Sequence, residues 1–224
     1  MRIKSLNIYS TNLSEQVPFY SEVLELPMLE STNESATFQI GESRFTIQHR
    51  VQTTPYHFAI NIPSNKVDEA LGWLQERVSV LNEGDRKIQN FEAWNAKAVY
   101  FYDRDKNIVE LIARKNLGLN SSNKFDTGSL LSISEIGIPV NNIEKIYAPI
   151  HRVTGLEIYD GSFERFCAVG DENGLFICVN KNLKTWFPSG DVAHSSDFSV
   201  KIETYNNLYF VEFVNGELKI TDKH

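Results

Sequence analysis

Cysteine is scarce in this 224-residue chain, which carries only Cys167 and Cys178. Two cysteines are too few for a disulfide framework or a four-cysteine zinc site, so we expect both to be small buried hydrophobic residues. Long apolar runs are also missing, because none approaches the roughly 18 residues that a transmembrane helix needs. The residues after Met1 show no signal-peptide pattern. The sequence therefore predicts a cytoplasmic protein with no membrane partner.

Clusters of basic residues are absent as well. The chain has 22 Lys and Arg residues against 29 Asp and Glu residues, which gives a net charge of −7. A nucleic-acid binder needs a concentrated positive surface, so we expect no nucleic-acid partner. Histidine is limited to five positions. Any imidazole chemistry must therefore come from His49, His57, His151, His194 or His224.

An internal repeat of strand, helix and further strands runs through the chain. Apolar and polar residues alternate in each predicted strand, and apolar residues recur at helical spacing in each predicted helix. Residues 116–128 are rich in Asn, Ser, Gly and Lys, as is typical of a linker. The stretch 197–220 alternates around turns at Asn206-Asn207 and Asn215-Gly216 and leaves no room for a helix. The first strands of the three full copies span residues 3–9, 57–62 and 133–140.

The sequence thus predicts an α+β protein built from three full βαβββ units and a truncated fourth. One unit alone has an open sheet edge and an exposed apolar face, so pairing two units buries both. Paired units form half-barrel mixed sheets with a cleft between them. We expect a first domain of two units over residues 1–115 and a second domain over residues 129–224, which holds one unit and the truncated one.

Two segments carry more specific patterns. Residues 18–27 read Pro-Phe-Tyr-Ser-Glu-Val-Leu-Glu-Leu-Pro, and residues 99–111 contain Asp-Arg-Asp-Lys-Asn followed by Glu-Leu. The first resembles the end of the first helix in the vicinal oxygen chelate superfamily, which includes glyoxalase I, bleomycin-resistance proteins, fosfomycin-resistance enzymes and extradiol dioxygenases. The second resembles that family's Phe-x-Asp-Pro-Asp-Gly-Asn-x-x-Glu-Leu signature, with Arg104 for Pro and Lys106 for Gly. The resemblance implies a glyoxalase/dioxygenase-like fold.

The resemblance also implies a divalent metal ion in the cleft, held by the first and last strands of paired units. In the second unit these positions fall on His57 and Glu110, and an imidazole with a carboxylate is a reasonable half-site. In the first unit they fall on Ser5 and Thr46, which are poor ligands. We therefore expect Zn, Ni, Mn or Fe at His57 and Glu110. The amide of Gln48 is a candidate for the third ligand that a catalytic metal needs.

The residues around this half-site have alternative roles. Glu110 is a candidate general base, a role that this position takes in isomerase members of the family. For His57 the simpler alternative is a cleft histidine hydrogen-bonded to Glu110 without metal. Trp94 precedes a strand of the second unit and is a candidate for stacking on a planar ligand. The residues expected to bind substrate are Asn7, Tyr9, Asn61 and Trp94.

The second half of the chain offers a weaker set. The corresponding positions of the third unit hold Glu135 and Phe176, and the truncated unit offers Asp197. An apolar ring in a ligand position argues against a second metal site. We therefore expect this half to stabilise the fold or to cover the ligand.

These patterns support two functions of different kinds. The first is a metal-dependent glyoxalase/dioxygenase-like enzyme, a lyase, isomerase or dioxygenase, acting on a small carbonyl, enol or catechol-type substrate in the cleft of the N-terminal unit pair. Extradiol dioxygenase activity is less favoured because Ser5 replaces one histidine. The alternative is a non-enzymatic protein of the bleomycin-resistance type that sequesters a small molecule. Family members often pair units across subunits, so a homodimer stays open.

Overall fold

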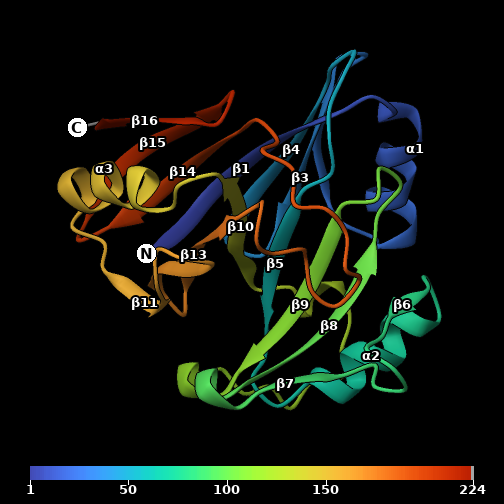
Figure 1. Ribbon diagram of the computed structural model, residues 1–224. Coiled ribbons are helices and arrows are strands. Elements are labelled where there is room, and N and C mark those ends of the chain that lie inside the picture. The colour runs from blue at the N-terminus through green and yellow to red at the C-terminus, as the bar shows by residue number, and fades with distance from the viewer. Residues whose placement is uncertain (223–224) are drawn as a thin grey trace.

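The computed structural model describes residues 1–222, so His224 lies outside the described part of the chain. Within residues 1–222, two mixed β-sheets are accompanied by three α-helices (Figure 1), which confirms the α+β class. No helix among these residues is long and apolar enough to cross a membrane. The helices are α1 (Leu13–Pro18), which continues into the π-helical turn η1 (Phe19–Val23), α2 (Val67–Gln75) and α3 (Glu144–Thr154).

The first sheet joins the two ends of the chain. Its seven strands lie in the order β16-β15-β14-β1-β4-β3-β2, and Figure 1 shows the N-terminal strand β1 beside β14 from the C-terminal part. The strands are β1 (Arg2–Ser10), β2 (Met28–Ser31), β3 (Ser35–Ile40), β4 (Ser43–His49), β14 (Phe198–Thr204), β15 (Asn207–Val214) and β16 (Glu217–Asp222).

The second sheet is built from the middle of the chain. Its order is β11-β12-β13-β10-β5-β9-β8-β6, and the short strand β7 also pairs with β8. The strands are β5 (His57–Ile62), β6 (Val80–Leu81), β7 (Gln89–Phe91), β8 (Ala96–Tyr102), β9 (Ile108–Arg114), β10 (Ser132–Val140), β11 (Ile158–Gly161), β12 (Phe166–Asp171) and β13 (Gly174–Asn180).

The sheets pair the units differently from the predicted domains. β1 of the first unit pairs antiparallel with β14 of the truncated unit, and β5 of the second unit pairs antiparallel with β10 of the third. Each sheet therefore combines one unit from residues 1–115 with one from residues 129–224. The expected cleft between the first and second units is wrong, because strand alternation carries no information about which open edges meet.

One face of each sheet packs into a shared apolar core. On β1 the buried residues Leu6 and Ile8 alternate with the half-buried Asn7 and Tyr9, and on β5 the alternate residues Phe58, Ile60 and Ile62 lie in the same core. Cys167 and Cys178 are free thiols buried there, as the sequence predicts. The helices contribute the buried residues Val67, Ala70, Trp73, Leu74, Ile146 and Ile150.

The truncated unit contains strands alone. β14, β15 and β16 are joined by two-residue turns in which both residues have positive φ, at Tyr205-Asn206 and at the predicted Asn215-Gly216. This backbone is that of the tight hairpin turns that match strand twist. The first turn begins one residue before the predicted Asn206-Asn207, since the register pairs Thr204 with Asn207.

The turn between β8 and β9 carries the Asp-Arg-Asp-Lys-Asn segment. The carboxylate of Asp103 accepts hydrogen bonds from the Tyr20 hydroxyl at 2.7 Å and from the backbone N–H groups of Asp105 and Asn107 at 3.0 and 2.9 Å. Lys106, which stands where the family pattern has Gly, has a φ of 64°. A side chain is strained in this left-handed conformation.

We expect the Lys106→Gly variant to be more stable to urea than the Lys106→Ala variant by about 1 kcal/mol, because only glycine relieves the strain. Both substitutions remove the same contact of the Lys106 Nζ with the Tyr102 ring, 5.0 Å from its centroid, so each controls for the other. Equal unfolding free energies for the two variants would contradict the assignment of strain to this turn.

Candidate functional site

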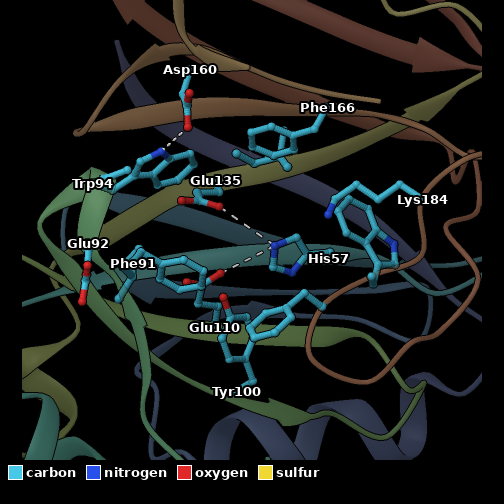
Figure 2. Close-up of a pocket in the computed structure, with 15 residues that line it drawn as sticks. His57, Phe91, Glu92, Trp94, Tyr100, Glu110, Glu135, Asp160, Phe166 and Lys184 are labelled. Carbon is cyan, nitrogen blue, oxygen red and sulfur yellow. Dashed lines mark hydrogen bonds and ion pairs between the residues drawn. The ribbon is translucent and has the colours of Figure 1, made fainter. Parts of the chain in front are cut away.

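Three neighbouring strands of the second sheet bring three titratable side chains together. β5 lies between β9 and β10, parallel to the first and antiparallel to the second. In this register Ala59 of β5 lies opposite both Glu110 and Glu135, and His57 occupies the same face two residues earlier. Figure 2 shows the three side chains converging, with a nitrogen or oxygen atom from each within 4.8 Å of the others.

A β-bulge at Ser134 directs Glu135 into this group. Opposite β5, Ile133 pairs with Ile60 and Glu135 with Ala59, so Ser134 is an extra residue in β10. Strict alternation from the buried Ile133 would turn Glu135 into the apolar core, whereas the bulge moves it to the opposite face. The placement of Glu135 beside His57 and Glu110 therefore depends on one inserted residue.

His57 is oriented by the backbone. Its Nδ1 lies 3.2 Å from the carbonyl oxygen of Ile108, and because a carbonyl only accepts, Nδ1 carries the proton and Nε2 the lone pair. Nε2 lies 3.6 Å from Oε2 of Glu110 and 4.0 Å from Oε2 of Glu135. Burial lowers the pKa of His57 to about 4, against the opposing effect of its hydrogen bond to Ile108, so the ring is neutral at neutral pH.

The two carboxyl groups differ in their partners. Burial raises the pKa of both, and the neighbouring charge of Glu135 raises the pKa of Glu110 further, to well above its usual range. Arg114, which is buried, donates from Nη2 to Oε1 of Glu135, and its positive charge opposes the shift. Glu110 accepts a hydrogen bond from Tyr100. Arg114 thus stabilises Glu135 as an anion, and Glu110 is the more readily protonated of the two carboxyl groups.

The donor set fits a divalent metal ion. Two carboxylate oxygens face the lone pair of the neutral His57, and within residues 1–222 no hydrogen-bond donor contacts Nε2. Such a group is unfavourable unless a proton or a cation lies among its members. Atoms about 2.1 Å from one ion lie roughly 3–3.5 Å apart, so the three ligand atoms, which lie within 4.8 Å of one another, would draw closer together around a bound ion. His57, Glu110 and Glu135 could therefore hold one ion.

The three residues lie at the base of a cavity of about 410 Å³ with aromatic walls. The Trp186 ring, from the segment between β13 and β14, covers His57 with 4.8 Å between the ring centroids. It lies directly on Gly137, where a Cβ atom would come within 2.7 Å of the indole, so only glycine fits beneath it. The aromatic residues that line the cavity are Phe91, Trp94, Tyr100, Phe166, Trp186 and Phe187.

Of the predicted substrate-binding residues, Trp94 lies in this cavity. It ends the short helix η2 (Glu92–Trp94), and its Nε1 donates to Asp160 at 2.6 Å. Asn61 shares the face of His57 but is buried at the far end of β5, where its Nδ2 donates to the carbonyl oxygen of Glu172 at 3.1 Å. Asn61 does not line the cavity.

Asn7 and Tyr9 lie in the other sheet, so the expectation that they share a cleft with His57 is wrong. Asn7 donates from Nδ2 to Oε1 of Gln48 at 3.4 Å, and the guanidinium of Arg50 lies 3.4 Å from the centroid of the Tyr9 ring. Gln48 is therefore not the third ligand. All three residues belong to the sheet that the first unit forms with the truncated unit.

Glu135 is the residue that sequence reasoning assigned to the wrong site. The pattern placed it with Phe176 in a separate, incomplete site, but Phe176 faces the apolar core and Ile177 lies on the Glu135 side of the sheet. Asp197 binds Arg50 at 2.8 Å, away from both. One signal was available, because the three-residue spacing of the buried Ile133 and Ile136 is that of a bulge. Arg114 and Trp186 carry no such signal.

Comparisons with known proteins find sequence relatives for part of the chain and fold neighbours for the whole of it. No family profile matches the chain. Part of it is similar to the metallothiol transferase FosB of Staphylococcus haemolyticus, with 28% identity over 120 residues that make up 49% of this chain and 83% of that protein. FosB of Staphylococcus epidermidis matches over the same length at the same identity.

Two solved structures share the fold of the whole chain. A putative dioxygenase from Bacillus subtilis matches 99% of this chain and 84% of its own, with a TM-score of 0.64 and 12% identity. Glyoxalase I from Zea mays matches 99% of this chain and 92% of its own, with a TM-score of 0.58 and 12% identity. These likenesses confirm the glyoxalase/dioxygenase-like fold.

We expect the Gly137→Ala variant to displace Trp186 from His57, because the new methyl group would overlap the indole. The displacement should change the tryptophan fluorescence and lower the unfolding free energy by about 1–3 kcal/mol. Gly72→Ala, in α2 with open space around its Cα, is the matched control and should be neutral or stabilising. An unchanged spectrum for Gly137→Ala would contradict the packing of Trp186 described above.

Proposed function

We propose that this chain, which shares its fold with glyoxalase I and part of its sequence with FosB, is an enzyme of the vicinal oxygen chelate superfamily that binds a divalent metal ion through His57, Glu110 and Glu135. Its substrate would be a small oxygen-bearing molecule in the cavity above them. The observation that carries this proposal is the convergence of three lone-pair atoms at the base of an aromatic cavity. A donor set of one imidazole and two carboxylates favours Mn or Fe, with Zn and Ni as competitors.

Different residues of the site would hold the metal ion, transfer a proton and exclude water. A bound metal ion would polarise a carbonyl or enol oxygen of the substrate. Glu135, anchored by Arg114, holds a fixed negative charge, and Ile108 keeps the His57 ring in one tautomer. Glu110 is suited to accept and return a proton, because burial and the charge of Glu135 raise its pKa well above its usual range. The Trp186 ring covers His57 and limits the access of water to this side of the cavity.

The names of the relatives set the range of reactions. FosB is a metallothiol transferase, and the two whole-chain fold neighbours are a putative dioxygenase and glyoxalase I. These names cover different reactions. They therefore support metal binding by this chain more strongly than they support any one reaction. The substrate class supported by this cavity is a carbonyl, enol or catechol-type compound.

A binding protein of the bleomycin-resistance type is the second candidate. The observation that favours it is the six-ring lining of the cavity, which suits the sequestering of a planar ligand by stacking alone. The two candidates differ in whether the ion is needed. Ligand binding to metal-free protein, with no ion retained under any condition, would favour the binding protein.

Elemental analysis and calorimetric titration with Mn²⁺ test the enzyme proposal. We expect one ion per chain in the wild type and a loss of affinity of at least about 100-fold in each of His57→Ala, Glu110→Gln and Glu135→Gln, because each removes one of three ligands. His151→Ala is the control, since His151 lies in α3, outside the cavity, and its affinity should equal the wild-type value. A wild type that binds none of Mn, Fe, Zn and Ni would overturn the proposal.

Metal affinity should also fall as the pH falls. The raised pKa of Glu110 means that an ion must displace its proton, so affinity should fall as the pH falls, and the fall should begin at a higher pH than for an ordinary carboxylate. His57, with a pKa of about 4, is already neutral and adds no dependence in this range. Titrations from about pH 8 to about pH 5 should show release of about one proton per ion. Residual binding by Glu110→Gln should show a flatter dependence, and an equally steep one would contradict the assignment.

A further inference from the structure

Lys184 is the one lysine or arginine whose side chain lines the cavity, among the residues that the structure describes. It comes from the segment between β13 and β14, two residues before Trp186. Figure 2 shows its amine directed into the space between Phe166 and His57. Its Nζ lies 5.8 Å from the centroid of the Phe166 ring. This ammonium group therefore faces the ligand space beside the aromatic wall.

The ammonium group has no carboxylate partner. Within residues 1–222 no Asp or Glu oxygen lies within 4.0 Å of its Nζ. The neighbouring Lys181, in contrast, has a hydrogen-bond partner, because its Nζ donates to Oγ of Ser195 at 3.0 Å. Partial burial and the nearby charge of Arg165 lower the pKa of Lys184, which shows that its surroundings disfavour the charge. A half-buried cation without a counter-ion is a costly arrangement that a bound anion would relieve.

The carboxylates of the cavity lie apart from this lysine. Glu92 and Asp160 gather around Trp94 on the opposite side, as Figure 2 shows, and Glu110 and Glu135 lie at the base with His57. In the metal-free cavity, a negative group on a ligand would be repelled by the carboxylates of Glu92, Glu135 and Asp160 and attracted by the ammonium group of Lys184. The charge pattern can therefore fix which end of a planar ligand points toward Lys184.

We propose that Lys184 determines substrate specificity by binding an anionic substituent of a planar substrate. The planar part would lie between the aromatic walls, and the reacting oxygen would face His57. The placement of the reacting oxygen at His57 rests on the proposed function. Anion selectivity by Lys184 does not, and it can be tested without metal. The substrate class is then a planar or aromatic acid that carries a hydroxyl or carbonyl group away from its charge.

The test compares two probes that differ in charge and little in shape, 3-hydroxybenzoate and 3-hydroxybenzamide. Their binding to metal-free and to Mn²⁺-loaded protein is followed by tryptophan fluorescence, since Trp186 and Trp94 line the cavity. We expect the wild type to prefer the acid in both states. Lys184→Met should weaken binding of the acid by about 10- to 100-fold, the range for a hydrogen bond between charged groups, and leave the amide within about twofold.

Two further variants make the result specific. Lys184→Arg keeps the charge and should retain most of the preference for the acid. Lys181→Met removes a neighbouring lysine that does not line the cavity, and it should behave as the wild type. Mn²⁺ affinity should be the same in Lys184→Met and wild type, so a failure of metal binding is recorded separately from a failure of anion selectivity.

Three outcomes would overturn the proposal. One is a wild type that binds the amide as tightly as the acid, and another is a wild type that binds neither probe. The third is a preference for the acid that appears only with Mn²⁺ and persists in Lys184→Met, which would mean that the carboxylate binds the metal instead. Loss of the preference in Lys184→Met but not in Lys181→Met would support it.

Discussion

The antiparallel pairing of β5 with β10 is the contact on which the whole site depends. β5 and β9 belong to one repeat unit and would place His57 near Glu110 in any arrangement of the units. The second carboxylate, Glu135, joins them only because β10 pairs at the free edge of β5 and carries a bulge at Ser134. A shift of that register by one residue would exchange Glu135 for an apolar neighbour and bury the charge in the core.

The charges beneath the cavity explain why this site suits a cation. Two buried carboxyl groups share a single close positive charge, that of Arg114, whose Nε and Nη1 find no partner among the described residues. Burying two anions beside one cation is unfavourable, so the pKa of Glu110 is raised. A divalent ion bound among these groups would supply the missing positive charge. Without an ion, protonation of a carboxyl group is the remaining way to reduce the repulsion.

The sequence predicts the repeat, the α+β class and the proximity of His57 and Glu110, because alternation and a local signature are properties of adjacent residues. It does not predict the partner of each unit, since His57 and Glu135 lie on the first strands of two successive units and their meeting depends on edge pairing. For the same reason Asn7 and Tyr9 are assigned to a cleft that their sheet does not form. Trp186 and Lys184 lie in the irregular segment between β13 and β14, where the sequence has neither strand nor helix periodicity from which their positions could be predicted.

The two sheets also show why chemistry is confined to one of them. β1 repeats the bulge of β10, since its register to β14 passes from Ile3 directly to Ser5, and Ser5 therefore occupies the place of Glu135. The truncated unit runs β15 antiparallel beside β14, so it lacks the parallel strand that carries Glu110 in the second unit. With a serine at one ligand position and no strand for another, the first sheet cannot assemble three ligands. Completing that sheet is then the contribution of the truncated unit, which buries the first unit's edge and leaves the second and third units to form the cavity.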